Sequence, residues 1–231
     1  MNKCAVILLA AGSGRRMRGV VDDKILMKVN GIEVFRYSLE AFINSGCVSG
    51  FVVVYRDEAQ KDALMALCKD VSLPLFWVQG GVERQHSVFN GVKGLPEEFE
   101  YVMIHDCARP LITIQNIREL YDAVVEDKAA VLAHRVTNTV KCVKDTGKGS
   151  RCCYAEDVDR SSLWATETPQ AFERKLILDA YNNVHTNNLR ITDDVSAASL
   201  AGHSITFVEN NTPNPKLTTP SYLKYIEFLL R

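Results

Sequence analysis

The stretch Leu8–Lys28, LLAAGSGRRMRGVVDDKILMK, follows directly on the apolar run 4–9, CAVILL. A short apolar run without polar alternation is typical of a parallel strand that is buried on both faces. Gly12 and Gly14 then let the backbone turn sharply and approach a ligand closely. Basic residues fill the rest of the stretch: Arg15, Arg16, Arg18, Lys24 and Lys28. Because backbone amides and guanidinium groups both bind anions, this loop predicts a polyphosphate site.

Three interpretations of the loop remain open. It could be a surface loop whose arginines are solvated. It could be a dinucleotide-binding turn, but Met17 stands at the third glycine position, and Glu33, at the right distance for the ribose acid, precedes a helical pattern. The third interpretation is a nucleoside triphosphate loop outside the Walker type. The pattern LAAGxGxRM followed by a lysine resembles the signature of nucleotidyltransferases that activate sugars and polyols.

Composition indicates one globular domain over residues 1–231. The chain is 47% hydrophobic and 24% charged, which is sufficient for a large core. The net charge of −1 gives no general attraction to nucleic acid or to an anionic membrane, so we expect neither partner. No apolar run approaches the ~18 residues of a membrane span. With no signal or transit pattern, we expect a cytoplasmic protein, or a stromal one if the source has plastids.

Seven cysteines occur, an odd number without a CxxC pair. This pattern favours reduced, partly buried thiols and predicts no zinc site. Cys107 is the only cysteine expected near a reactive centre, where it would fill space. The five histidines show no triad or metal spacing, so we expect structural roles for them.

Apolar periodicity predicts alternating strands and helices. Strands are predicted over 4–9, 51–55, 75–78, 101–105, 129–133 and 205–208, with brief pairing at 216–218. Helices are predicted over 34–43, 57–69, 83–95, 114–126, 173–184, 193–201 and 220–230, with Thr192 as the N-cap of the sixth. The alternation indicates an α/β, Rossmann-like, mostly parallel sheet with helices on both faces. The glycine loop, Gly80–Gly81 and Asp106 would then meet at the carboxyl edge of the sheet, where ligands bind.

Residues 137–164 interrupt this pattern. Residues 139–144 alternate as a half-exposed strand does, 145–149 form a turn, and 151–158 return. The segment predicts an inserted β-hairpin arm. A two-stranded ribbon is marginally stable alone, so we expect it to pack on a second copy of the chain. The alternative is a hairpin folded back on its own domain.

A set of motifs spans nearly the whole chain in order: LAAGSGRRM, GGVERQHSV, IHDCARP, VDRSSLW, TPQAF, ITDD and NPKLTTP. In order and spacing they resemble the 2-C-methyl-D-erythritol 4-phosphate cytidylyltransferase family of the non-mevalonate isoprenoid route. The resemblance implies the nucleotidyltransferase fold, Mg²⁺ as cofactor and a homodimer formed through the hairpin arm. It also implies transfer of CMP from CTP to methylerythritol phosphate, with release of pyrophosphate. No protein nucleophile is needed, because the substrate phosphate attacks the α-phosphorus in line.

The resemblance further implies roles for individual residues on the nucleotide side. Residues implied to bind cytosine, ribose or the phosphates are Ala10, Ala11, Gly12, Gly14, Gly81 and Ser87. Arg16 and Lys24 would hold the triphosphate, and Asp106 would sit at the magnesium site. Two alternatives stay open: Ser87 as a small residue that opens a helix face, and Asp106 as a salt-bridge partner of Arg109.

On the polyol side, the implied substrate contacts are Asp106, Arg109, Thr139, Arg160, Thr168 and Thr192. Thr139 and Arg160 would come from the partner subunit's arm, and Arg160 would hold the substrate phosphate. Lys216 would stabilise the pentavalent phosphorus. Together with Arg16, Lys24 and Arg160 it completes the implied catalytic set. Thr168 and Thr192 could equally be local caps.

The chain departs from the family pattern near these residues. It reads Asp23-Lys24-Ile25 where Pro-Lys-Gln is usual, with one extra residue before Lys24. Asp22 and Asp23 thus bring negative charge near a triphosphate. Asn138 stands where an aspartate is common, and prolines flank Asn214. The rival functions are a ribitol-5-phosphate cytidylyltransferase, which typically reads AGGxG in the first loop, a nicotinamide oxidoreductase and a non-catalytic nucleotide-binding protein.

Overall fold

The computed structural model describes residues 2–12, 23–145 and 153–230. Its main sheet has seven strands in the order β11-β7-β10-β6-β1-β4-β5. Their bounds are β1 Cys4–Leu9, β4 Gly50–Tyr55, β5 Leu75–Gln79, β6 Tyr101–Asp106, β7 Ala129–Arg135, β10 Trp164–Glu173 and β11 Thr206–Glu209. Only β10 runs antiparallel to its neighbours β6 and β7. The predicted α/β class and mostly parallel sheet are therefore confirmed, although β10 was not predicted.

The seven predicted helices are all present, with ends shifted by a few residues. They are α1 Val34–Ser45, α2 Glu58–Leu67, α3 Arg84–Lys93, α4 Ile114–Asp127, α5 Arg174–Thr186, α6 Asp194–Leu200 and α7 Pro220–Leu229. One predicted cap is wrong. Asp193, not Thr192, is the N-cap of α6, and its carboxylate accepts a hydrogen bond from the Ser196 N–H at 3.0 Å. A carboxylate at this position also interacts favourably with the positive end of the helix.

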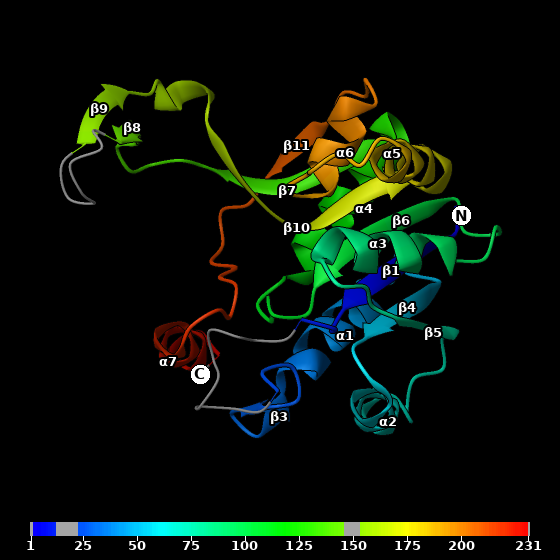
Figure 1. The fold of residues 1–231 in the computed structure, drawn as a ribbon. Helices are drawn as coiled ribbons and strands as arrows, with labels where there is room; N and C mark the ends of the chain where they lie inside the picture. Colours follow the sequence, from blue (N-terminus) through cyan, green and yellow to red (C-terminus); the bar gives the residue numbers. More distant parts are fainter. Residues whose placement is uncertain (1, 13–22, 146–152, 231) are drawn as a thin grey trace.

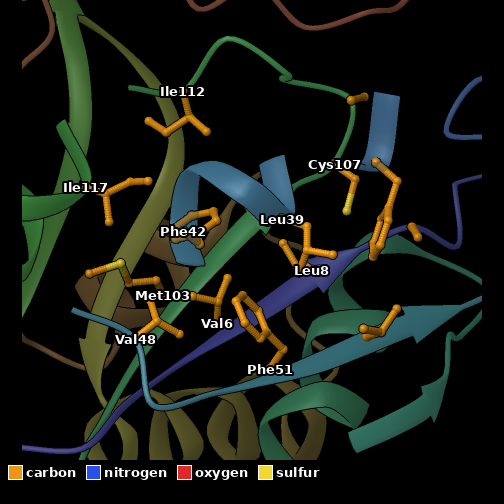
Figure 2. Packing of buried hydrophobic residues seen from close by; sticks show 14 of the residues in the cluster. Val6, Leu8, Leu39, Phe42, Val48, Phe51, Met103, Cys107, Ile112 and Ile117 are labelled. Atoms are coloured by element: carbon orange, nitrogen blue, oxygen red, sulfur yellow. The ribbon is translucent and has the colours of Figure 1, made fainter. Parts of the chain in front are cut away.

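Residues along β1 point alternately to the two faces of the sheet, so each face has apolar side chains for helices to cover. Cys4, Val6 and Leu8 join one core cluster with α1, α4 and α7, shown in Figure 2 around Phe42 and Leu39. Ala5 and Ile7 join a second cluster under α3, α5 and α6. Because helices cover both faces of the sheet, a ligand is expected to bind at the carboxyl ends of the strands.

The inserted hairpin is also present. Strands β8 Lys141–Asp145 and β9 Cys153–Asp157 pair antiparallel, and a short 3₁₀ turn over Arg160–Ser162 leads back to β10. Figure 1 shows this arm standing clear of the sheet. A smaller ribbon, β2 Lys28–Val29 and β3 Ile32–Glu33, turns through Asn30-Gly31, both at positive φ. The predicted pairing at 216–218 amounts to one hydrogen bond, from Leu217 N–H to the Ala108 carbonyl at 2.7 Å.

No helix among the described residues is long and apolar enough to cross a membrane.

Candidate active site

Among the cavities at the carboxyl ends of the strands, two share the same charged residues. The first, of about 430 Å³, we call the edge cavity. Its lining includes Ala10, Ala11, Gly12, Lys24, Arg56, Gly81, Arg84, Ser87, Asp106 and Lys216. The second, of about 230 Å³, we call the side cavity. Its lining includes Arg84, Asp106, Arg109, Thr168, Thr192 and Lys216. Since Arg84, Asp106 and Lys216 line both cavities, the two cavities meet at these charged groups.

The sheet topology explains why residues distant in sequence converge here. β1, β4 and β6 are parallel, so the loop after β1, Arg56 after β4 and Asp106 at the end of β6 share one edge. β10 runs the opposite way, which brings its beginning, including Thr168, to the same edge. The predicted convergence is confirmed for Gly12, Gly81 and Asp106, which line the same cavity.

Asp106 is held by two cations. Lys216 Nζ donates to its Oδ2 at 2.5 Å and Arg84 Nε donates to its Oδ1 at 3.2 Å. Burial would raise the pKa of Asp106, but these two cations outweigh burial and hold that pKa well below its usual range. The alternative salt bridge to Arg109 is wrong, because Arg109 Nη1 donates instead to the Asn214 carbonyl at 2.6 Å.

Arg84, which the sequence interpretation missed, organises the junction of the cavities. It is the first residue of α3, where the helix dipole disfavours a cation. Its two terminal nitrogens donate to Asp194 at 2.9 and 2.8 Å in a fork. Asp194 is fully buried and also accepts from the Tyr181 hydroxyl at 2.5 Å. The carboxylates of Asp194 and Asp106 therefore offset the unfavourable position of the guanidinium.

The wall of the edge cavity is built from residues without bulky side chains. A Cβ added to Gly81 would lie 2.3 Å from the Cβ of His86, and one added to Gly80 would lie 2.6 Å from the Cβ of Ala11. The Ser87 hydroxyl accepts from the Gly81 N–H at 3.0 Å and donates to the Glu83 carbonyl at 3.2 Å. Ser87 thus lines the cavity and also orders the turn that opens α3.

The acid before Lys24 is neutralised within the protein. Asp23 Oδ2 accepts from Arg56 at 3.0 Å and from Gln60 at 2.7 Å. Arg56 therefore compensates the charge that the departure from the family pattern introduces at this position. Lys24 Nζ donates to the carbonyl of Leu217 at 3.0 Å. Leu217 directly follows Lys216 in the chain. Gly14, Arg16 and Asp22 lie outside the described residues, so their assigned roles stay predictions.

Arg109, on the side cavity, is partly buried and keeps hydrogen-bonding capacity. Burial lowers the pKa of its guanidinium from the ordinary value. Among the described residues its buried Nε has no hydrogen-bond partner. A buried donor without a partner is costly, so this atom favours a ligand that brings an acceptor.

The two predicted threonine contacts have local partners as well. The Thr168 hydroxyl accepts from the Asp106 N–H at 3.1 Å and lies 3.3 Å from His105 Nδ1. The Thr192 hydroxyl lies 3.0 Å from that of Ser196. Both residues line the side cavity despite these local contacts.

Thr139 and Arg160 are not brought to either cavity in the single chain. Both are exposed on the arm, where Arg160 Nη1 donates to the Thr137 carbonyl at 2.5 Å. Neither residue lines the edge cavity or the side cavity.

The groups beside Asp106 are not poised for nucleophilic catalysis. Burial lowers the pKa of His105 to about 3 and raises that of Cys107 well above its ordinary value, so both are neutral near pH 7. Cys107 is buried beside Asp106 as a space-filling residue, as predicted. Within residues 2–12, 23–145 and 153–230, no group of three or more His, Cys, Asp or Glu side chains could hold a metal ion. The arrangement can therefore align and neutralise anions.

Comparisons with known proteins find one family over nearly the whole chain. The family model described as IspD, 2-C-methyl-D-erythritol 4-phosphate cytidylyltransferase, matches residues 4–231. A protein of that name from Bacillus velezensis is 36% identical over 228 residues, covering 98% of this chain and 95% of the relative. One from Clostridioides difficile is 34% identical over 229 residues, covering 98% and 93%.

Solved structures give the same picture of the fold. The 4-diphosphocytidyl-2C-methyl-D-erythritol synthase of Anaerococcus prevotii superposes with a TM-score of 0.86 at 24% identity, covering 100% of this chain and 99% of that one. The 2-C-methyl-D-erythritol 4-phosphate cytidylyltransferase of Francisella tularensis superposes with a TM-score of 0.79 at 26% identity, covering 98% and 99%.

Proposed function

Because the chain belongs to the family of 2-C-methyl-D-erythritol 4-phosphate cytidylyltransferases, we propose that its edge cavity binds CTP and its side cavity binds methylerythritol phosphate. The activity of the family is transfer of CMP from CTP to this polyol phosphate in isoprenoid precursor synthesis. One observation carries the assignment of the cavities. Lys216 and Asp106 line both of them, at the point where two phosphates would meet.

The chemistry follows from this juxtaposition. The phosphate of the polyol is already ionised, so it attacks the α-phosphorus of CTP in line, and pyrophosphate leaves as the P–O bond to it breaks. Negative charge gathers on the oxygens of the five-coordinate phosphorus, where the ammonium of Lys216 stabilises it. Arg84 supplies a second fixed positive charge at the same junction. Alignment and charge neutralisation then lower the barrier without a covalent protein intermediate.

The nucleotide lies against the first glycine loop in this arrangement. Ala10, Ala11 and Gly12 bind the cytosine and ribose together with Gly81 and Ser87, which line the same cavity. Lys24 faces the triphosphate from the end of the loop, and Gly14 and Arg16 complete its phosphate contacts.

The residues present fit a magnesium ion carried in with the nucleotide. Mg²⁺ bound to nucleotides commonly takes one or two protein carboxylates and fills its other positions with phosphate oxygens and water. Asp106 is the carboxylate at the junction, and its low pKa keeps it ionised. When bound, the ion neutralises phosphate charge.

In the side cavity, Arg109 and the threonines Thr168 and Thr192 bind the polyol phosphate. Arg109 Nε, which no described residue hydrogen-bonds, is the donor that this substrate satisfies. The site is completed by Thr139 and Arg160 from the arm of the partner subunit in a homodimer, with Arg160 binding the substrate phosphate.

The reaction is tested by pyrophosphate release from CTP and magnesium, with methylerythritol phosphate and ribitol 5-phosphate as parallel acceptors. Rapid release with the first acceptor alone supports the proposal. Preference for ribitol 5-phosphate would replace it with the sister activity, and no release with either acceptor would contradict it.

The shared site is tested by mixing subunits. Arg160→Ala and Lys216→Ala homodimers are each expected to be impaired. Mixed dimers regain one intact site if Arg160 acts in the partner's cavity, so activity should return toward one half of the wild-type value. No recovery in verified mixed dimers would place Arg160 in its own subunit's site.

A further inference from the structure

A buried polar network forms part of the wall of the side cavity and is not used in the mechanism above. Its centre is Glu167, which is 5% exposed. Glu167 Oε2 accepts from the side-chain amides of Asn214 at 2.7 Å and Asn210 at 3.0 Å. Its Oε1 lies 2.6 Å from His134 Nδ1. A buried carboxylate needs such partners, so the position of each amide is fixed by the charge that it compensates.

Asn214 connects this network to the site. Its side-chain amide also donates to the Thr168 carbonyl at 3.2 Å, and its own carbonyl accepts from Arg109 Nη1 at 2.6 Å. The guanidinium of Arg109 is therefore held on one side by the backbone of Asn214. Its Nε has no hydrogen-bond partner within the described part of the chain and is left for a ligand.

Asn214 also precedes Lys216 by two residues on an extended segment. Pro213 and Pro215 fix φ on either side of Asn214, so the segment has few conformations. At the C-terminal end of this segment, the Leu217 N–H donates a hydrogen bond to the Ala108 carbonyl at 2.7 Å. The segment 214–217 is thus anchored on both sides of Lys216, through Glu167 before it and through Ala108 after it.

We propose that Glu167 and Asn214 form a positioning pair that places Arg109 and Lys216 for the polyol phosphate. The inference rests on the proposed function, because it takes Arg109 as a substrate contact and Lys216 as a catalytic group. Glu167 lines the side cavity, but both of its carboxylate oxygens are engaged, with Asn214 and Asn210 on one and His134 on the other, so the pair acts through Arg109 and Lys216. Asn214 fixes Arg109 through its carbonyl and Lys216 through the chain, and Glu167 fixes Asn214.

The pair has a kinetic signature that separates positioning from stability. Arg109 lines the side cavity and not the edge cavity. Disturbing the pair should therefore weaken methylerythritol phosphate binding and slow the chemical step, with CTP binding little changed. A purely structural role would lower the fraction of active protein and leave both KM values unaltered.

The test uses steady-state kinetics of the full-length enzyme with four single variants and one double variant. A misplacement of about 1 Å can cost about 10²-fold in rate, so Asn214→Ala is expected to raise the KM for methylerythritol phosphate and lower kcat by about tenfold or more each. The KM for CTP should stay within about twofold by the same reasoning. Asn211→Ala, on the same loop but exposed, is the matched control and should keep wild-type constants.

Glu167 gives an independent comparison. Glu167→Gln keeps an oxygen that accepts from Asn214 and turns its own amide toward His134, so it should remain near wild type. Glu167→Leu fills a similar volume without an acceptor and should reproduce the Asn214→Ala constants. The Glu167→Leu/Asn214→Ala double variant should be no worse than either single variant, because residues that act as one unit are not additive.

Unaltered KM for methylerythritol phosphate in folded Asn214→Ala would overturn the proposal, as would equal damage by Glu167→Gln and Glu167→Leu. Should Asn214→Ala fail to fold, as judged by circular dichroism, the two Glu167 variants carry the test. Failure of the proposed function looks different, since the wild-type enzyme itself would then release no pyrophosphate with methylerythritol phosphate.

Discussion

Replacing Asp194 by Asn breaks the fork that holds Arg84. Asp194 is fully buried and accepts two hydrogen bonds from this guanidinium and one from Tyr181. An asparagine of the same size offers one acceptor oxygen in place of two and no charge. Arg84 then keeps Asp106 as its only carboxylate partner among the described residues, at 3.2 Å.

The expected loss can be scaled from burial. Removing one partner of a buried ion pair costs about 3–5 kcal/mol. Because the Arg84 side chain is 30% exposed and keeps Asp106 as a partner, we expect a loss at the lower end, about 3 kcal/mol. For a domain of this size, about 2–4 °C in Tm accompanies each kcal/mol, so Tm should fall by about 6–12 °C. Calorimetry and urea denaturation at pH 7 measure the loss.

The chain supplies a matched control in the pair of Arg36 and Asp70. That pair is also a fork, with distances of 2.6 and 2.9 Å, but the Asp70 side chain is 67% exposed. Asp70→Asn should cost far less than Asp194→Asn, since solvent screens exposed pairs. Equal losses for Asp194→Asn and Asp70→Asn, or a loss below about 1 kcal/mol for Asp194→Asn, would refute the reasoning from burial.

Three further predictions concern activity, pH and the nucleotide loop. Lys216→Ala, like Arg16→Ala, should lower kcat by about 10²–10³-fold without unfolding the protein; near-normal turnover would remove the assigned role. Because the folded pKa of His105 is about 3, against 6.5 for the ordinary side chain, the unfolded chain binds the extra proton between these values. Stability should therefore fall by about 1.4 kcal/mol per pH unit below pH 6.5, and His105→Gln should remove this slope in urea titrations between pH 6.5 and 4.5. An unchanged slope would mean that other groups cause it. Gln60 donates to the Ala10 carbonyl at 3.1 Å and to Asp23 at 2.7 Å, so it ties together the two ends of the glycine loop. Gln60→Leu should raise the KM for CTP several-fold and leave that for methylerythritol phosphate unchanged, whereas equal changes in both would indicate general damage.

Much of the fold was predictable because its central strands and helices obey simple apolar periods. Strand β10 was not predicted from the sequence, because its residues WATETPQAFE place polar side chains in the interior and include a proline. Its buried Glu167, Thr168 and Gln170 are satisfied by partners from other elements, which no local pattern reveals. The ribbon β2–β3 could have been found, because Asn30-Gly31 is a strong hairpin signal.

The position of the site was predictable where a residue directly follows or ends a central strand, as for Asp106 and Gly12, which line one cavity. Arg84 was missed, although a cation in the first turn of a helix is locally unfavourable and so signals a partner elsewhere. The neutralisation of Asp23 was not predictable either. It depends on Arg56 and Gln60, which are more than 30 residues away and reach it only through the folded sheet.

The central claim is that fixed cations let one phosphate displace pyrophosphate from another in a single step, without a protein nucleophile. The most direct test follows the configuration at phosphorus with CTP that carries sulfur at a chiral α-phosphorus. A single in-line displacement predicts inversion in the cytidine diphosphate product. Retention of configuration would require two displacements and a covalent enzyme intermediate, and would contradict the account.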